Sequence, residues 1–281
     1  MSIKRVATIQ DISCFGKCSL TVALPLISSV GIETSVIPTA VLSTHTGGFE
    51  GFTYRDLTSD IPEIAKHWKD IGLKFDTFYT GYLGSFEQLK IVSDIFDDFE
   101  SDDTMVFVDP VMGDNGNLYT GFSNEFAKEM RKLCCKADVI APNMTEAAFM
   151  LDMEYRDISP NEEYVKDIVK KLSDCCKEKV ILTGVSYNGN DIGIMTYDKK
   201  TGKFFSYSRD RIGGHYHGTG DVFSSVCVAA LTKGFSFEDS TKLAVDFVIE
   251  CINRTLPERE EHWYSVKYEE CIPLLIEKLN K

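Results

Sequence analysis

Short apolar runs alternate with helix-like segments along nearly the whole chain, and this alternation constrains the fold more than any other feature. Such runs become buried parallel strands when each is followed by a helix that returns the chain over one face of the sheet. The runs expected to be strands cover residues 6–9, 34–38, 75–80, 105–108, 138–141 and 180–182. The sequence therefore predicts an α/β fold, with a mainly parallel sheet covered by helices on both faces.

The segments between these runs have the periodicity and the end signals of helices. Capping-box sequences at residues 60–63 and 159–162 predict the starts of two of them. The other expected helices cover residues 18–30, 85–99, 122–135, 145–151, 221–231, 238–254 and 269–280. Residues 192–197 and 203–207 are expected to form a hairpin. No linker, repeat or low-complexity segment interrupts the pattern, so we expect a single domain over residues 1–281.

Composition excludes several classes of protein. The chain has 43% hydrophobic and 26% charged residues, which is ordinary globular usage. Its net charge of −13 argues against nucleic acid or an anionic membrane as a partner. No apolar run reaches the ~20 residues that span a bilayer, and residues 1–10 resemble a strand rather than a leader. Nine cysteines without a Cys-x-x-Cys pair favour a reduced, cytoplasmic protein.

The stretch Gly218-Thr219-Gly220-Asp221 opens one of the expected helices. Glycines allow a ligand to approach the backbone, and the first N–H groups of a helix have no intrahelical acceptor, so this end favours phosphate. A carboxylate beside a phosphate site repels the phosphate, so its presence there needs another explanation. Asp221 suits a general base that takes the proton of an attacking hydroxyl. The alternative is an ordinary aspartate that complements the helix dipole.

Polar residues follow four of the expected strands directly, at Asp11, Asp109, Asn143 and Thr183. Ligands of open parallel sheets gather beyond the carboxyl ends of the strands, so we expect these residues at one edge.

Three carboxylates, those of Asp109, Asp114 and Glu146, could converge at this edge. Mg²⁺ prefers oxygen ligands and often reaches carboxylates through its own waters, so the cluster suits a cation that neutralises phosphate charge. The alternatives are a loop-capping role for Asp109 and an exposed position in the first helical turn for Glu146.

Three further segments are considered as sites. Residues 39–52 are polar, small and rich in glycine, which suits either a substrate loop or a plain surface loop. Residues 16–19 resemble a P-loop superficially, but the earlier glycine is absent and Cys18 follows the lysine, so a nucleotide site of that kind is rejected. His215 and His217 could bind a metal, although a loop pair without further ligands is more often incidental.

Taken together, these motifs resemble the ribokinase superfamily, and within it most closely the pyridoxal kinases. The resemblance runs from Val6 to about Leu231 and rests on four motifs in the family's order. The motifs are Ser43-Thr44-His45-Thr46-Gly47, Asp109-Pro110-Val111-Met112-Gly113, Pro142-Asn143-x-x-Glu146 and Gly218-Thr219-Gly220-Asp221. The resemblance implies a three-layer α/β/α fold, a homodimer, and transfer of the ATP γ-phosphoryl group to the 5′-hydroxymethyl of pyridoxal, pyridoxine or pyridoxamine.

The resemblance also assigns roles position by position. Asp221 matches the catalytic base, and Gly218, Thr219 and Gly220 match the anion hole. Substrate contacts are implied for Asp11, Thr46, Tyr82 and Asp221. The implied ATP-binding residues are Asp109, Asp114, Tyr119, Asn143, Glu146, Thr183, Gly218 and Gly220. Asp109 and Glu146 are the implied metal ligands, with Mg²⁺ as the metal and K⁺ left open as a further cation.

Two positions depart from the family pattern. Many relatives have Gln-Ser-His after the first strand, whereas this chain has Gln10-Asp11-Ile12, so Asp11 replaces a serine that contacts the pyridine ring. A carboxylate there can accept a hydrogen bond from a protonated ring nitrogen or the 4′-amine. Our hypothesis is a preference for pyridoxamine or pyridoxine over pyridoxal. Leu42 stands where some relatives have an aromatic residue, which weakens the expectation of ring stacking.

Three rival functions are compatible with parts of this pattern. Hydroxymethylpyrimidine kinases share the fold but often have cysteine in place of Asp221. A sugar or nucleoside kinase fits the short chain and the 44–47 loop less well. A noncatalytic B6-binding protein would have little need of an intact Gly-x-Gly-Asp motif.

Overall fold

The computed structural model describes residues 3–280. By their contacts they divide into two compact units, which are described separately. The first unit comprises Met1–Gly81, Asp98–Thr104 and Ile212–Lys281, and the second comprises Tyr82–Asp97 and Met105–Arg211. The single domain expected from the sequence remains a prediction.

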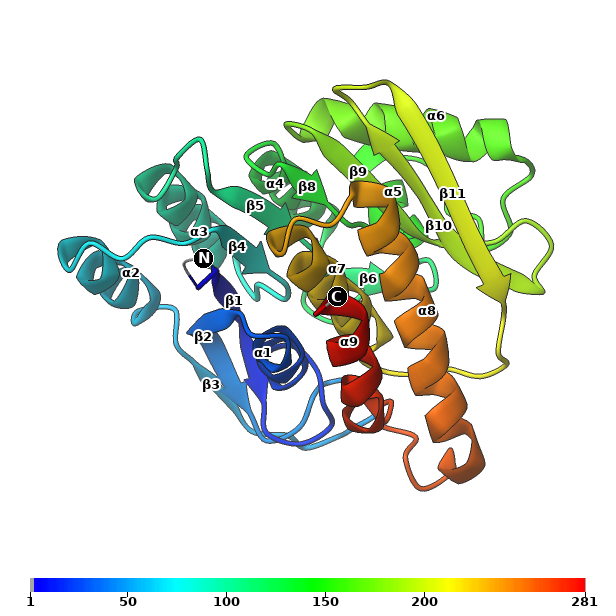
Figure 1. The fold of residues 1–281 in the computed structure, drawn as a ribbon, viewed down its shortest axis with the longest axis horizontal. Coiled ribbons are helices and arrows are strands. Elements are labelled where there is room, and N and C mark those ends of the chain that lie inside the picture. Colours follow the sequence, from blue (N-terminus) through cyan, green and yellow to red (C-terminus); the bar gives the residue numbers. More distant parts are fainter. Residues whose placement is uncertain (1–2, 281) are drawn as a thin grey trace. The chain divides into compact units, whose positions relative to one another are not determined.

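The first unit is built around β1 (Arg5–Ser13), which is buried along almost its whole length. It pairs in parallel with β2 (Glu33–Leu42) on one side and with β4 (Thr77–Thr80) on the other (Figure 1). The short β3 (Tyr54–Asp56) adds an antiparallel edge to β2. Because both faces of β1 are covered, it has no polar alternation, as expected for a buried parallel strand.

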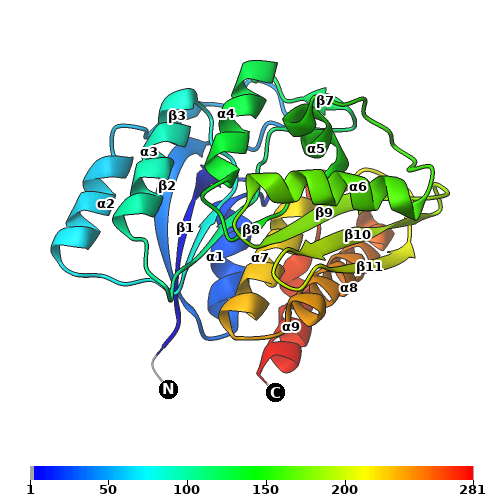
Figure 2. The ribbon, with the colours of Figure 1, turned by 90° about the horizontal axis from the view of Figure 1, so that it is seen from above.

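Helices of the first unit pack on these strands and on one another. They are α1 (Leu20–Ser29), α2 (Ile61–Asp70), α7 (Thr219–Thr232), α8 (Phe237–Thr255) and α9 (Ile272–Leu279), with 3₁₀ turns η2 (Leu256–Glu258) and η3 (Tyr268–Cys271). The α7 helix lies between α1 and α8 and also contacts β4 (Figures 1 and 2). Contact on several sides explains why α7 is apolar around nearly its full circumference.

The second unit contains β5 (Met105–Val108), β8 (Val139–Ile140) and β9 (Lys179–Val185), which are mutually parallel. An antiparallel pair, β10 (Asp191–Asp198) and β11 (Lys203–Asp210), continues from β9 and confirms the predicted hairpin. The helices are α3 (Phe86–Asp98, all but its last residue), α4 (Asn124–Cys134), α5 (Met144–Leu151) and α6 (Glu162–Leu172), with η1 (Ser173–Cys175). Figure 2 shows α6 alongside β9 and β10, which it contacts.

Both units confirm the predicted α/β class with mainly parallel pairing. None of the helices within residues 3–280 is long and apolar enough to cross a bilayer. All nine cysteines are free thiols. The sequence did not reveal β3 or the small hairpin of β6 (Gly113–Asp114) and β7 (Asn117–Leu118), because these segments are too short to show a period.

Neither predicted capping box forms, although the first marks the start of its helix correctly, since α2 begins at Ile61. Asp60 is the N-cap of α2, but its backbone is already helical and its side chain caps no N–H group. Ser159 lies before the start of α6, which is capped instead by Asn161 accepting from the Tyr164 N–H at 2.9 Å. The backbone N–H of Ser159 donates to the carbonyl of Ser186, which fixes it outside the helix.

Candidate active site

The N-terminus of α7 has the geometry of an anion-binding helix end. Gly218 is its N-cap, with a left-handed φ of 77°, and the helix begins at Thr219, two residues before the predicted start. A Cβ on Gly218 would lie 2.6 Å from the carbonyl oxygen of Lys17, so only glycine allows this approach. The first backbone N–H groups of a helix have no intrahelical acceptor, so this end suits an anion, and the anion site itself remains a prediction.

Asp221 lies in the first turn of α7 and is partly exposed, with protein atoms crowding its carboxyl group. Loss of water around this group raises its pKa from 3.8 to about 7, opposed by a hydrogen bond from the Ser19 N–H. The charge of Asp11 raises the pKa further, and a hydrogen bond with the Cys18 thiol lowers it. A carboxyl group that titrates near neutrality suits a general base, because it both accepts and releases a proton at working pH.

Asp11 is a second acid near Asp221, and it is buried. It lies in β1 at an irregularity of the pairing with β2, and its side chain is 4% exposed. The hydroxyl of Ser13 donates to it at 3.1 Å, while burial raises its pKa. The charge of Asp11 acts on Asp221, so the two acids lie near each other in the structure.

Cys18 and Ser19 belong to this site, and sequence reasoning missed them. The 16–19 segment was considered only as a nucleotide-binding loop. Left-handed backbone at Lys17 and Ser19, with φ of 54° and 55°, turns the segment toward α7. The only signal in the sequence was the polar, glycine-bearing stretch directly after the first strand.

The loop that carries Thr46 is also part of the first unit. Thr46 is exposed, whereas the preceding His45 is buried. Gly47 packs so closely on His217 that a Cβ would lie 2.6 Å from its Nδ1 atom. The loop therefore reaches the residue that directly precedes Gly218. The rings of His215 and His217 are 4.6 Å apart.

In the second unit, Glu146 is held in a reciprocal cap at the start of α5. Its Oε2 atom accepts from the Asn143 N–H at 2.8 Å, and the Asn143 side chain accepts from the Glu146 N–H at 2.9 Å. Oε1 accepts from the Met112 N–H at 3.1 Å. Glu146 is only 3% exposed, so an exposed first-turn position, the alternative for this residue, is wrong.

Asp109 and Asp114 lie close enough to act on Glu146. Burial raises the pKa of Glu146 well above its usual range, and the charges of Asp109 and Asp114 raise it further. Asp109 is 7% exposed and follows β5, and Asp114 lies in β6. Asp109 and Asp114 therefore lie within electrostatic range of Glu146, and a metal site formed by these acids remains a prediction.

Thr183 and Tyr119, two further predicted ATP residues, and Tyr82, a predicted substrate contact, are in the same unit, whereas Gly218 and Gly220 are in the first. Thr183 forms an isolated parallel bridge with Asn143. Tyr119 is 40% exposed, and its N–H donates to the Met112 carbonyl. The ring of Tyr82 contacts Phe122 at 5.5 Å between centroids.

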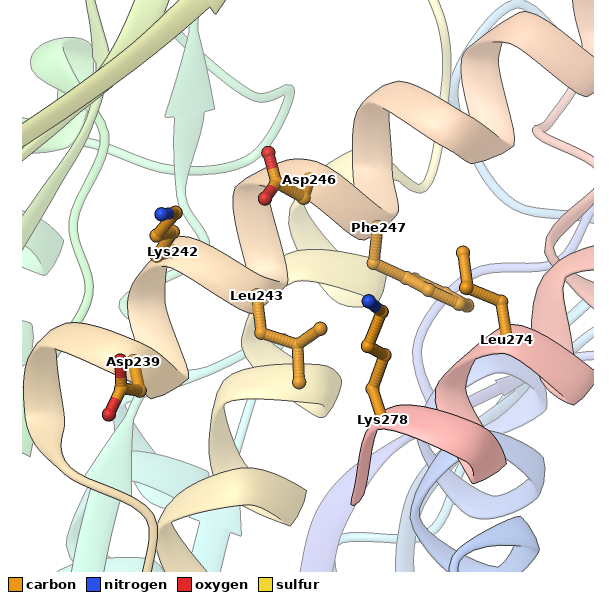
Figure 3. A pocket seen from close by; sticks show the side chains of 7 residues that line it. All are labelled: Asp239, Lys242, Leu243, Asp246, Phe247, Leu274 and Lys278. Carbon is orange, nitrogen blue, oxygen red and sulfur yellow. The ribbon is translucent and has the colours of Figure 1, made fainter. Parts of the chain in front are cut away.

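Two surface pockets lie away from these residues. One of about 270 Å³ lies between α8 and α9 (Figure 3), and its lining residues are Asp239, Lys242, Leu243, Asp246, Phe247, Leu274 and Lys278. Another of about 440 Å³ lies in the second unit and is lined mainly by α4 and α5. Neither is lined by a predicted site residue.

The fold is that of the ribokinase-like kinases. The crystal structure of pyridoxal kinase from Lactobacillus plantarum has a TM-score of 0.89 to this chain at 28% identity, covering 98% of this chain and 97% of that one. The family model described as phosphomethylpyrimidine kinase matches residues 25–264, and the chain belongs to that family.

Other relatives carry two kinds of name. A Bacteroides thetaiotaomicron protein, assigned provisionally as a phosphomethylpyrimidine kinase, is 38% identical with a TM-score of 0.94, over 98% of this chain and 94% of that chain. A second crystal form of that protein contains pyridoxal. The pyridoxal kinase of Dictyostelium discoideum is 26% identical, over 92% of this chain and 91% of its own length.

Proposed function

We propose that the protein is an ATP-dependent kinase that phosphorylates the 5′-hydroxymethyl group of pyridoxal, pyridoxine or pyridoxamine. The observation that carries this proposal is Asp221, a carboxyl group with a pKa of about 7 in the first turn of a glycine-capped helix. The pyridoxal kinases among the relatives and the pyridoxal-containing relative support the same substrate class.

In the proposed reaction, Asp221 accepts the proton of the hydroxymethyl group as its oxygen attacks the γ-phosphorus of ATP. Hydrogen bonds from the Ser19 N–H and the Cys18 thiol hold the carboxylate in place. The N–H groups of the turn that contains Gly218, Thr219 and Gly220 stabilise the charge that develops on the transferring phosphoryl group.

Asp11, Thr46 and Tyr82 are the proposed vitamer contacts. Asp11 is the most informative of them, because it is a buried carboxyl group where many relatives have serine, and Ser13 is its hydrogen-bond donor within the protein. A protonated ring nitrogen or 4′-amine would supply a further donor, which supports the hypothesis of a preference for pyridoxamine or pyridoxine.

ATP is proposed to contact Asp109, Asp114, Tyr119, Asn143, Glu146 and Thr183, with Gly218 and Gly220 at the phosphates. Mutual repulsion among the buried acids fits a divalent cation such as Mg²⁺, which neutralises phosphate charge when bound. Both oxygens of Glu146 already accept backbone N–H groups, so Glu146 would act on the cation through water. Asp109 is the other proposed metal residue. Among residues 3–280, no group of three or more acid, histidine or cysteine side chains is arranged to hold a metal ion.

Hydroxymethylpyrimidine phosphorylation is the second candidate. The family description and the name of the Bacteroides relative favour it, and its substrate also presents a hydroxymethyl group on a nitrogen heterocycle. Purified protein should be incubated with Mg-ATP and each B6 vitamer or hydroxymethylpyrimidine, with the phosphorylated product measured by mass spectrometry. Product from a vitamer supports the first candidate, and product from the pyrimidine alone contradicts it.

The proposal includes a homodimer located in the cytoplasm. Light scattering on the purified protein tests the dimer directly. Whether the reaction also requires a monovalent cation such as K⁺ is left open, and exchanging K⁺ for tetramethylammonium in the same assay tests it.

A further inference from the structure

The imidazole of His45 uses both of its nitrogens in hydrogen bonds. Nδ1 accepts from the Gly47 N–H at 3.0 Å, and Nε2 lies 2.7 Å from the carbonyl oxygen of Tyr264. Because Nδ1 is an acceptor, the ring proton must lie on Nε2 and point at Tyr264. The side chain is only 6% exposed, and burial lowers its pKa, which keeps this neutral form.

The bond to Tyr264 joins segments that are 219 residues apart in the chain, whereas the bond from Gly47 lies within the loop. One of the two segments is this loop, which carries Thr46, and the other is residues 259–269, which we call the C-terminal strap. The ring of Phe49 contacts Trp263 of the strap at 4.7 Å. A Cβ on Gly48 would lie 2.8 Å from the same indole, so the loop residues that follow His45 also pack closely on the strap.

The strap also reaches the two other loops of the proposed site. Arg259 donates to the carbonyl of Gly213 at 3.4 Å and lies over the ring of Tyr216, just before the glycine-rich turn. At its other end, Glu269 pairs with Lys17 at 2.8 Å, next to Cys18. All three loops around Asp221 thus contact one segment.

We propose that His45 is a positioning residue, through which the C-terminal strap holds the Thr46 loop in the shape that binds the vitamer. The inference rests on the proposed function. Consecutive glycines at 47 and 48 leave the loop many conformations, and ordering it on binding costs free energy that a preformed loop avoids. His45 acts on vitamer binding through the loop and has no part in proton or phosphoryl transfer.

The two hydrogen bonds can be separated by substitution. Asparagine in His45→Asn can still accept from the Gly47 N–H, as in an Asx turn, but is too short to reach Tyr264. Glutamine in His45→Gln places an N–H₂ group near the position of Nε2 and can keep the link to the strap. Trp263→Ala removes the other contact. His67→Asn, on the exposed side of α2, is the matched control.

Steady-state kinetics and melting temperatures of these variants test the proposal. We expect His45→Asn to raise KM for pyridoxal about three- to tenfold, the loss of one net hydrogen bond, with KM for ATP and the melting temperature near wild type. His45→Gln should recover most of the affinity, Trp263→Ala should raise the same KM, and His67→Asn should change nothing.

An unchanged KM for pyridoxal in His45→Asn overturns the inference. So does an equal loss in the asparagine and glutamine variants that follows a fall in melting temperature, because it indicates a purely structural role. A wild-type protein that phosphorylates no vitamer refutes the proposed function itself, and the inference with it. An active wild type with unaffected variants refutes the inference alone.

Discussion

Asparagine in place of Asp221 keeps the shape of the side chain but cannot take a proton. It can still accept a hydrogen bond from the Ser19 N–H, so the loop around it should remain in place. Positioned base catalysis contributes roughly a hundred- to ten-thousand-fold to rate. We therefore expect Asp221→Asn to lower kcat by at least about a hundredfold, while ATP still binds.

The same substitution should stabilise the protein at alkaline pH. The pKa of Asp221 is about 7 in the folded protein, against 3.8 for an aspartate in the unfolded chain. The folded protein therefore holds this proton more tightly than the unfolded chain does. That stabilisation is complete below the unfolded-state pKa and is lost as pH rises through about 7. The difference of about 3 between the folded and unfolded pKa of Asp221 corresponds to at most roughly 4 kcal/mol in the free energy of unfolding. This is an upper bound because Asp221 is partly exposed.

Thermal melting and turnover, measured on wild type and Asp221→Asn, test both expectations. The variant should melt higher than wild type near pH 8.5 and at a similar temperature near pH 4. Asp239→Asn is the matched control, since Asp239 is an exposed third residue of α8 just as Asp221 is the third residue of α7. Near-normal turnover in Asp221→Asn, or a stability difference that does not vary with pH, refutes the reasoning.

Three further substitutions test other parts of the site. Asp11→Ser should shift the relative kcat/KM for the three vitamers toward pyridoxal, and an unchanged ranking would end the hypothesis on specificity. Gly218→Ala should lower the free energy of unfolding by roughly 1–3 kcal/mol in urea, because its φ is 77° and its Cβ would meet the Lys17 carbonyl at 2.6 Å; a change within error contradicts this. Glu146→Ala should lower the free energy of unfolding by roughly 2 kcal/mol or more, since two buried N–H groups lose their acceptor. An unchanged urea midpoint would show that water replaces the carboxylate as acceptor.

The strands could be predicted because each is a continuous apolar run between helix-like segments, and most helices because their segments are long enough to show a period. Where the sequence failed, local geometry decided the outcome. The sequence could not show that the backbone of Asp60 is already helical, or that a bond to Ser186 holds Ser159 outside α6. The reciprocal cap of Asn143 and Glu146 went unrecognised, although both residues were singled out for ATP and metal binding.

The sequence allowed residues to be proposed for the site, but it did not show their contacts. Asp221 was singled out because it opens an expected helix, and Asp11 because it follows the first apolar run; the structure places Asp11 within β1, which extends to Ser13. Cys18 was missed because its contact with Asp221 depends on left-handed backbone on either side, at residues that are not glycine. The bond from His45 to Tyr264 crosses most of the chain, and no local pattern marks it.

The central claim is that the Asp221 carboxylate is the base of a phosphoryl-transfer reaction, and the pH dependence of kcat/KM tests it most directly. With pyridoxal and saturating Mg-ATP, the rate should rise with pH through an inflection near the pKa of about 7 and then level off. The residual activity of Asp221→Asn should lack that inflection. A flat wild-type profile through neutrality, or the same inflection in the variant, would contradict the claim.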